Sequence, residues 1–298
     1  MIFPPFFAIL KGKRGGRIMK LHYVKVNPAQ NMTVFVLDQI PRKDHAEISR
    51  KLMSYESVHA EQVGFIEKTS LPDSTETLRL QMMGGEFCGN ASRSFAAYMV
   101  YTGYPSIKSQ GEDYLVPIQV SGWERNVDCI VTPLGERNRF RSRIQMPLPH
   151  SVGAQEFVIQ GETISTIRVD FFGITHFVVD KDAVRSTLEF FNIIKTQMDQ
   201  EGYEAFGIMF YDFEEKYLEP LVYVKGTDTT CWEKSCASGT AALGVCLSYL
   251  DDVSISRDVN QPGGTLNIEV RWSEGSADEI FLDGDVEIIS EGTVSLNL

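Results

Sequence analysis

Two stretches of the chain repeat one pattern, Gly84-Gly85-Glu86-Phe87-Cys88-Gly89-Asn90-Ala91 and Lys234-Ser235-Cys236-Ala237-Ser238-Gly239-Thr240-Ala241. In each, a cysteine is followed by a very small residue, a short polar residue and a second very small residue, and an apolar run typical of a helix comes next. The sequence therefore predicts two helices that each begin at a cysteine. Because one motif occurs twice, we also expect two related halves.

A cysteine in the first turn of a helix is well placed for acid–base chemistry. The unpaired N–H groups there and the positive end of the helix dipole stabilise a thiolate, which lowers the thiol pKa below its usual value of about 8.5. The same N–H groups bind anions, and the small residues Gly89, Ala237 and Gly239 predict room for a carboxylate. Two such sites facing each other predict a racemase, in which one thiolate removes an α-proton and an opposing thiol returns one. The alternative, two buried structural cysteines, is less favoured because the motif is duplicated.

Composition favours a protein that binds a small molecule. The 298 residues, 43% of them hydrophobic, suffice for one large domain or two of ordinary size. A net charge of −12 argues against binding to nucleic acid or to an anionic membrane. Five cysteines, without a Cys-x-x-Cys pair or a recognisable export signal, predict free thiols in the cytoplasm and no metal site. We therefore expect a small-molecule ligand, which the racemase interpretation makes an amino acid. A homodimer is the candidate assembly.

The first residues need a separate interpretation. Residues 2–10 are apolar and residues 11–20 are rich in basic side chains, which is the reverse of a secretory signal, and so short an apolar run cannot span a bilayer. The segment Arg14-Gly15-Gly16-Arg17 has the composition of a translated ribosome-binding site. Our hypothesis is that the natural chain starts at Met19 and that residues 1–18 are a non-native or disordered extension. The mass of the native protein tests it.

The order of predicted elements is similar in the two halves. Strand-like segments begin at Leu21, a helix is expected over about 43–55, and more strands precede the first cysteine motif; strands, a helix over about 185–200 and further strands precede the second. This order predicts two mixed α/β domains with the ligand between them. We place the first domain at 19–138, completed by a last strand at about 286–298, and the second at 139–285.

Further segments complete a recognisable set, namely Asn31, Glu61-Gln62-Val63-Gly64-Phe65-Ile66, Gln145-Met146-Pro147, His176 and Gln261-Pro262-Gly263-Gly264. Together with the two cysteine segments they resemble the diaminopimelate epimerase superfamily over essentially Met19 to Leu298. The resemblance implies an α/β (mixed α+β) fold with two pseudo-symmetric domains, each a mixed sheet wrapped around a central helix. It also implies that Cys88 and Cys236 are the catalytic pair, and that no cofactor, neither pyridoxal phosphate nor metal, is used.

Departures from the diaminopimelate epimerases indicate another substrate. Thr227 and Asp228 stand where those enzymes carry a Glu-Arg pair whose arginine binds the distal carboxylate, and Ile174-Thr175-His176 stands where they carry Asn-Pro-His. A site without that arginine suits a substrate with a single carboxylate. The sequence therefore disfavours diaminopimelate itself, although epimerisation of that compound stays open as an alternative.

The chain is more similar to the histidine racemases of opine-type metallophore biosynthesis. The similarity rests on Asn27-Pro28, on the run that begins at Glu61, and on Trp232-Glu233 before the second cysteine. It implies conversion of L-histidine to D-histidine. Outside the racemases, the alternatives are a redox protein that cycles a disulfide between the two cysteines, and a relative that keeps the fold without the chemistry.

The expected site residues divide by role. Backbone N–H groups of the two cysteine segments are expected to bind the α-carboxylate, and the side chains of Asn31 and Asn90 to hold the head group. Glu61 is either a partner for an imidazole or a solvated carboxylate at a strand edge, and His176 either orients a thiol or is a structural residue of a strand. The catalytic residues are Cys88 and Cys236, and the substrate-binding residues are Asn31, Glu61, Gly89, Asn90, His176, Ala237, Ser238 and Gly239.

Overall fold

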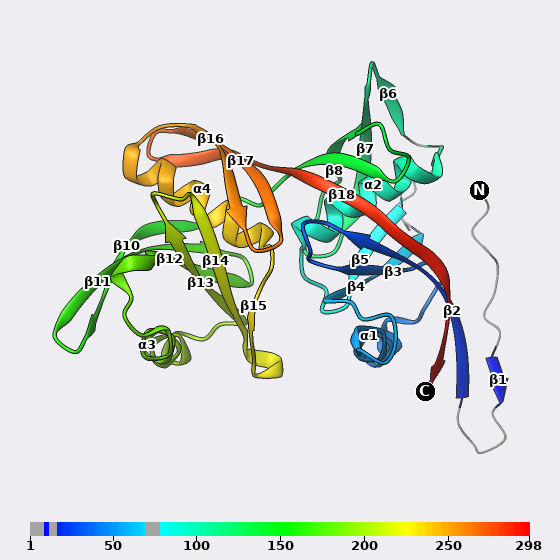
Figure 1. Ribbon diagram of the computed structural model, residues 1–298, viewed down its shortest axis with the longest axis horizontal. Helices are drawn as coiled ribbons and strands as arrows, with labels where there is room; N and C mark the ends of the chain where they lie inside the picture. The colour runs from blue at the N-terminus through cyan, green and yellow to red at the C-terminus, as the bar shows by residue number, and fades with distance from the viewer. Residues whose placement is uncertain (1–8, 12–16, 69–77, 106) are drawn as a thin grey trace. The chain divides into compact units, whose positions relative to one another are not determined.

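The computed structural model describes residues 9–11, 17–68, 78–105 and 107–298 (Figure 1). The chain divides into two compact units, which are residues 1–144 with 284–298 (unit 1) and residues 145–283 (unit 2). Residues 139–144, which were expected in the second domain, belong to unit 1 and pair with its preceding strand, Phe140 opposite Pro133 and Ile144 opposite Cys129. Each unit is described by itself below.

Unit 1 contains two helices within a mixed sheet. Its elements are β1 Ile9–Lys11, β2 Arg17–Asn27, β3 Thr33–Val36, α1 His45–Met53, β4 Gln62–Lys68, β5 Leu78–Met82, α2 Gly89–Thr102, β6 Lys108–Gln110, β7 Asp113–Val120, β8 Val127–Pro133, β9 Arg139–Gln145 and the end of β18 Ser276–Asn297. β2 pairs antiparallel with β3, β3 parallel with β4 across α1, and β4 antiparallel with β5. The cysteine motif and α2 follow, and β7, β8 and β9 then form an antiparallel series.

Unit 2 repeats this order. Its elements are β10 Ser151–Ile159, β11 Glu162–Phe171, β12 Ile174–Asp180, α3 Thr187–Glu201, β13 Ala205–Asp212, β14 Tyr217–Val224, β15 Thr229–Trp232, α4 Ala237–Asp251, β16 Ile255–Gln261, β17 Gly264–Ser273 and the start of β18. β11 pairs antiparallel with β12, β12 parallel with β13 across α3, and β13 antiparallel with β14. The repeated pairing scheme confirms the predicted pseudo-symmetric α/β fold.

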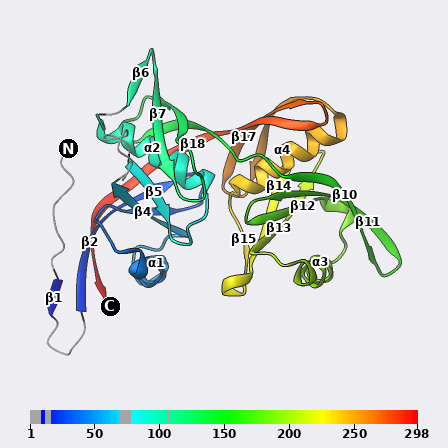
Figure 2. The ribbon, with the colours of Figure 1, turned by 180° about the vertical axis from the view of Figure 1, so that it is seen from behind.

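The cysteine helices α2 and α4 are central, whereas α1 and α3 are peripheral. Every residue of α2 from Gly89 to Met99 is buried, including the polar Asn90 and the charged Arg93. α1 and α3 bury one stripe each, Ile48 with Leu52 and Phe190 with Ile194 and Met198. Figures 1 and 2 show α1 and α3 along one side of the strands of their own units, with α2 and α4 along the other.

The fold contains strands that were not expected from the sequence, and one of them lies in the N-terminal segment. β6, β9, β10, β15 and β16 were not predicted. β15 is exposed and β10 is exposed or half-buried except at Phe157, so neither shows a clear alternation of apolar residues. Part of the proposed N-terminal extension is described: β1 pairs with β2, Ile9 opposite Met19. Residues 1–8 and 12–16, which belong to the same hypothesis, lie outside the described residues. Among the described helices, none is long and apolar enough to cross a membrane.

Candidate active site

Both cysteines are the N-cap residues of their helices, as predicted. Cys88 has an extended backbone (φ −129°, ψ 110°), and the N–H of Ala91 donates to its Sγ at 3.4 Å. Cys236 has nearly the same backbone (φ −115°, ψ 110°), and the N–H of Gly239 donates to its Sγ at 3.3 Å. Each sulfur therefore occupies the place that a serine or aspartate oxygen takes in an ordinary helix cap.

A turn of unit 1 holds the loop before Cys88. Ser121, at the end of β7, accepts a hydrogen bond from the N–H of Met82 (2.9 Å) and donates to the carbonyl of Glu86 (2.7 Å). Gly122 has φ +69°, and a β-carbon there would lie 2.3 Å from the backbone nitrogen of Phe87. A glycine is required for this close approach of two backbones. Neither Ser121 nor Gly122 carries a motif that sequence inspection could single out.

Two amide side chains connect Cys88 to the carboxylate of Glu61 within unit 1. The Cys88 thiol donates to Gln62 Oε1 at 3.0 Å, and Gln62 Nε2 donates to Asn31 Oδ1. Asn31 Nδ2 donates to Glu61 Oε2 at 3.1 Å. We call Glu61, Asn31 and Gln62 the amide chain. The parallel pairing of β3 with β4, Thr33 opposite Gln62, brings these residues together although they are thirty positions apart.

The structure thus places Asn31 and Glu61 near Cys88 and adds Gln62, to which sequence analysis assigned no role. Strand alternation explains the position of Gln62: Val63 and Phe65 of β4 belong to the apolar cluster around α1, which directs Gln62 to the opposite face.

Asn90 has a position different from the one expected for a head-group contact. Its side chain is buried, and Arg93 Nε donates to its Oδ1 at 3.2 Å. Arg93 is itself fully buried and donates from Nη1 to the carbonyl of Asp285 at 2.8 Å. The carbonyl end of Asn90 is therefore held within unit 1, and contact of Asn90 with a ligand stays a prediction. No sequence pattern around Arg93 predicts that this residue is buried.

A glutamine of unit 2 holds the loop before Cys236, as Ser121 holds the loop before Cys88. Gln261 Oε1 accepts from the N–H of Cys236 (2.9 Å), and its Nε2 donates to Thr240 Oγ1 (2.9 Å). The Thr240 hydroxyl donates to the carbonyl of Cys236 (2.6 Å), and the N–H of Gly263 donates to the carbonyl of Lys234 (2.7 Å). The Gln261–Gly264 segment therefore fixes the backbone at the start of α4.

A buried histidine contacts the Cys236 cap through a serine. His176 Nε2 lies 2.9 Å from Ser238 Oγ, which lies 3.6 Å from Cys236 Sγ. Phe177 and Val179 of the same strand face the cluster around α3, so alternation turns His176 toward α4. Burial lowers the pKa of His176 to about 3, so its ring is neutral at physiological pH. Gly207 provides the space for the ring, since a β-carbon there would lie 2.4 Å from His176 Nδ1.

The protonation of Cys236 corrects a prediction. The helix start was expected to lower the pKa of this thiol, but the pKa is raised well above its ordinary value. Burial of the thiol is the largest cause, followed by the negative charge of Glu233 and a hydrogen bond to it. The hydroxyl of Ser238 and the N–H of Gly239 act in the opposite direction and are outweighed. Cys236 is therefore a thiol, and Glu233, three residues earlier, adds to the effect of burial.

Gly239 also has a role different from the one predicted. A β-carbon at this position would lie 2.2 Å from Met209 Sδ and 3.1 Å from Cys236 Sγ. The missing side chain makes room for Met209, not for a ligand, and the N–H is already bonded to the cysteine sulfur.

The first two positions of each helix have no intrahelical acceptor for their N–H groups. These positions are Gly89 and Asn90 in α2, and Ala237 and Ser238 in α4.

The positions that replace the Glu-Arg pair hold local contacts only. Asp228 Oδ1 accepts from the hydroxyl of Tyr223 at 2.7 Å, and Thr227 Oγ1 lies 2.7 Å from Thr229 Oγ1. A substrate with one carboxylate stays a prediction.

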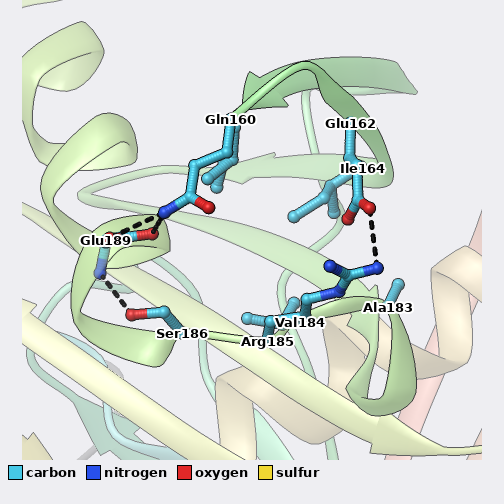
Figure 3. Close-up of a pocket in the computed structure, with 9 residues that line it drawn as sticks. Gln160, Glu162, Ile164, Ala183, Val184, Arg185, Ser186 and Glu189 are labelled. Carbon is cyan, nitrogen blue, oxygen red and sulfur yellow. Dashed lines mark hydrogen bonds and ion pairs between the residues drawn. The ribbon is translucent and has the colours of Figure 1, made fainter.

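A surface pocket of unit 2 lies away from these residues. Figure 3 shows it between the β10–β11 turn and the start of α3, where Gln160 donates to Glu189 and Arg185 forms an ion pair with Glu162 at 2.6 Å. None of the predicted site residues lines it. We therefore do not assign the site to this pocket.

Comparison with solved structures shows the fold. The chain is similar to a hydroxyproline epimerase from Agrobacterium vitis, with a TM-score of 0.67, 12% identity, and coverage of 97% of this chain and 95% of that one. It is also similar to a methylitaconate-delta-isomerase, with a TM-score of 0.60, 11% identity, and coverage of 94% and 96%.

Sequence comparison shows the family. The family model described as "Histidine racemase CntK N-terminal domain" matches residues 20–295. A histidine racemase of Fusobacterium nucleatum is 36% identical over 94% of this chain and 98% of its own length. A histidine racemase of Staphylococcus aureus is 27% identical over 91% of this chain and 96% of its own. The chain therefore belongs to the histidine racemase family of isomerases.

Proposed function

We propose that this protein converts L-histidine to D-histidine without a cofactor, using Cys88 and Cys236 as the two acid–base groups. The observation that carries the proposal is the matched pair of caps, in which a cysteine sulfur accepts a backbone N–H at the start of a central helix in each unit. Family membership supports the reaction, and the repeated topology supports one base from each unit.

The environments of the two sulfurs suggest their roles in the first turnover. Cys236 holds its proton, because burial and Glu233 raise its pKa, and it is the acid. Cys88 is half-buried and becomes the base. The Cys88 thiolate takes the α-proton, the Cys236 thiol gives its proton to the opposite face of the α-carbon, and the centre is inverted. The roles are exchanged when the reaction runs from the other enantiomer.

The helix starts supply the electrostatic part of the mechanism. An α-proton is far less acidic than a thiol, so the carbanion must be stabilised as it forms. The N–H groups of Gly89, Asn90, Ala237 and Ser238 are the donors we assign to the α-carboxylate, where negative charge develops. Donors of this kind contribute most where water is excluded, because the local dielectric constant is then low.

Glu61 is the side chain we assign to the imidazole. Its Oε2 already accepts a hydrogen bond from Asn31, but a carboxylate can accept several.

The positions Thr227 and Asp228 offer no cation for a second carboxylate, so diaminopimelate is the less favoured substrate. A redox function is the other alternative, and Cys88 and Cys236 are both free thiols here.

Solvent isotope exchange tests the proposal. L-Histidine incubated with the protein in deuterium oxide should lose its circular dichroism and gain one deuterium at the α-carbon, whereas a redox protein exchanges no α-proton. Rapid exchange on meso-diaminopimelate with none on histidine would contradict the proposed substrate.

We further propose that the reaction takes place in the cytoplasm and supplies D-histidine to opine-type metallophore synthesis. A strain that lacks the protein should lose such a metallophore and recover it when D-histidine is added.

A further inference from the structure

The amide chain of unit 1 has a direction. The Cys88 thiol donates to an oxygen of Gln62, the nitrogen of Gln62 donates to an oxygen of Asn31, and the nitrogen of Asn31 donates to Glu61. A carboxylate can only accept hydrogen bonds, whereas each amide has one accepting and one donating end. Glu61 therefore determines which way Asn31 points, and Asn31 determines which way Gln62 points. The end of Gln62 that reaches the Cys88 sulfur is therefore its carbonyl oxygen, a hydrogen-bond acceptor.

An acceptor at this position suits one protonation state of the sulfur. A thiol can donate to Gln62 Oε1, as it does here at 3.0 Å, whereas a thiolate needs a donor. If both amides turned over, Gln62 Nε2 would donate to the thiolate, in a stronger, charge-assisted hydrogen bond. Asn31 Oδ1 would then face the carboxylate of Glu61, acceptor against acceptor. The negative charge of Glu61 opposes that arrangement.

We propose that Glu61 and Asn31 are positioning residues that hold the acceptor end of Gln62 toward Cys88, so that the carboxylate favours the thiol form of the catalytic base. The thiolate form then requires the two amides to turn over together. The inference deepens the proposed function and rests on it for the role of Cys88 as a base. In that role, the Cys88 thiolate gains the α-proton of one enantiomer while Cys236 gives a proton to the opposite face, and Cys88 gives a proton to the α-carbon only when the reaction runs from the other enantiomer.

Other charged groups lie near this cap in the sequence. Glu86 lies two residues before Cys88, and desolvation raises the pKa of its carboxyl. Arg93 lies within the same helix and is bonded to Asn90 and to the carbonyl of Asp285. The first turn of α2 donates to the sulfur through Ala91.

The test is the pKa of Cys88, measured from the pH dependence of its alkylation by iodoacetamide and read on the Cys88 peptide by mass spectrometry. The exposed Cys231 is an internal reference in the same sample. Glu61→Gln should lower the Cys88 pKa by about half a unit to one unit, since a neutral amide no longer enforces one orientation. Asn31→Ala should lower it at least as far, because it breaks the chain while the charge of Glu61 remains.

The Asn31→Ala variant distinguishes an effect of amide orientation from direct charge repulsion between Glu61 and the Cys88 thiolate. If Glu61 acted through space, Glu61→Gln would lower the Cys88 pKa and Asn31→Ala would not, and that result would overturn the proposal. An unchanged pKa in both variants would overturn it as well. The matched control is Glu56→Gln, which removes the same charge from an exposed position and should leave the pKa as in the wild type.

Two further measurements keep the result unambiguous. Gln62→Glu leaves an acceptor and adds a negative charge beside the sulfur, so it should raise the Cys88 pKa by at least about one unit; a fall would contradict the proposal. Thermal unfolding of each variant identifies any that fails to fold. Because alkylation reads the sulfur without turnover, a failure of this proposal is distinct from a failure of histidine racemisation.

Discussion

The two cysteine caps have the same local geometry and different surroundings. Both sulfurs accept a backbone N–H at 3.3–3.4 Å from an N-cap residue with an extended backbone. Cys88 is half-buried and faces an amide, whereas Cys236 is buried and interacts with Glu233 and with Ser238. The comparison teaches that a helix start alone does not set the pKa of a thiol, because burial and a neighbouring carboxylate can outweigh it.

The means of holding the two caps are also different. A serine and a left-handed glycine fix the loop before Cys88, whereas Gln261 fixes the loop before Cys236 through one bond to its backbone and one to Thr240. Both supports come from equivalent places in the two halves, at the end of β7 and at the end of β16. The duplicated fold therefore conserves the position of the support and changes its chemistry. The predictions below test whether the two caps also differ in function.

The largest effect is expected from removing either sulfur. Cys88→Ser and Cys236→Ser should each reduce racemisation of histidine by at least about a thousandfold, because a serine hydroxyl is too weak an acid to supply a base at neutral pH. Circular dichroism of L-histidine over time measures the loss. On a substrate with a β-leaving group, each variant should retain elimination from one enantiomer only. Full racemisation by either variant would contradict the two-base mechanism.

A smaller loss is expected from Glu61→Gln. Removing a charge-assisted hydrogen bond to the imidazole, worth about 1.5–3 kcal/mol, should lower kcat/KM for histidine roughly tenfold to more than a hundredfold. The value for alanine, if alanine reacts, should change much less. An equal loss on both substrates would mean that Glu61 acts only through Cys88, and Glu56→Gln controls for the change in net charge.

The histidine behind the Cys236 cap should make the protein sensitive to acid. Its pKa is about 3 in the folded state and about 6.5 in an unfolded chain, so stability is lost as the pH falls from about 6.5 toward 3. Between pH 7 and pH 5 the loss is about 2 kcal/mol. His176→Gln, which cannot titrate, should show a weaker pH dependence of the urea midpoint. Burial also lowers the pKa of His45 in unit 1, so the His176→Gln variant should still lose some stability as the pH falls. An unchanged pH dependence would show that His176 is not the group concerned.

The smallest effect concerns the pKa of Cys236. Glu233→Gln removes the charge that helps to hold this thiol protonated, so the pKa of Cys236 should fall by about one unit while burial keeps it above the ordinary value. The basic limb of the pH profile of kcat/KM should move to lower pH by the same amount. Glu214→Gln, an exposed position of unit 2, is the matched control. A shift toward higher pH would exclude Cys236 as the acid.

Much of the fold was predictable because its main signals are local. The Cys-small-polar-small motif, followed by an apolar run, predicted the starts of α2 and α4, since the cap and the small residues of the first turns are neighbours in the sequence. Its duplication predicted the pseudo-symmetric halves. The exposed strands β10 and β15 could not be predicted in this way, because they carry little apolar alternation.

By itself, the sequence determined the two cysteine caps, the mixed α/β class and the membership of Asn31, Glu61 and His176 in the candidate site. Only the tertiary structure decided what surrounds each sulfur. Gln62 reaches Cys88 because two parallel strands pair, and His176 reaches Ser238 because strand alternation turns it toward α4. The pKa of a buried group depends on desolvation and on charges that packing brings near it. No local motif contains that information, so the protonation of Cys236 became apparent only in the folded chain.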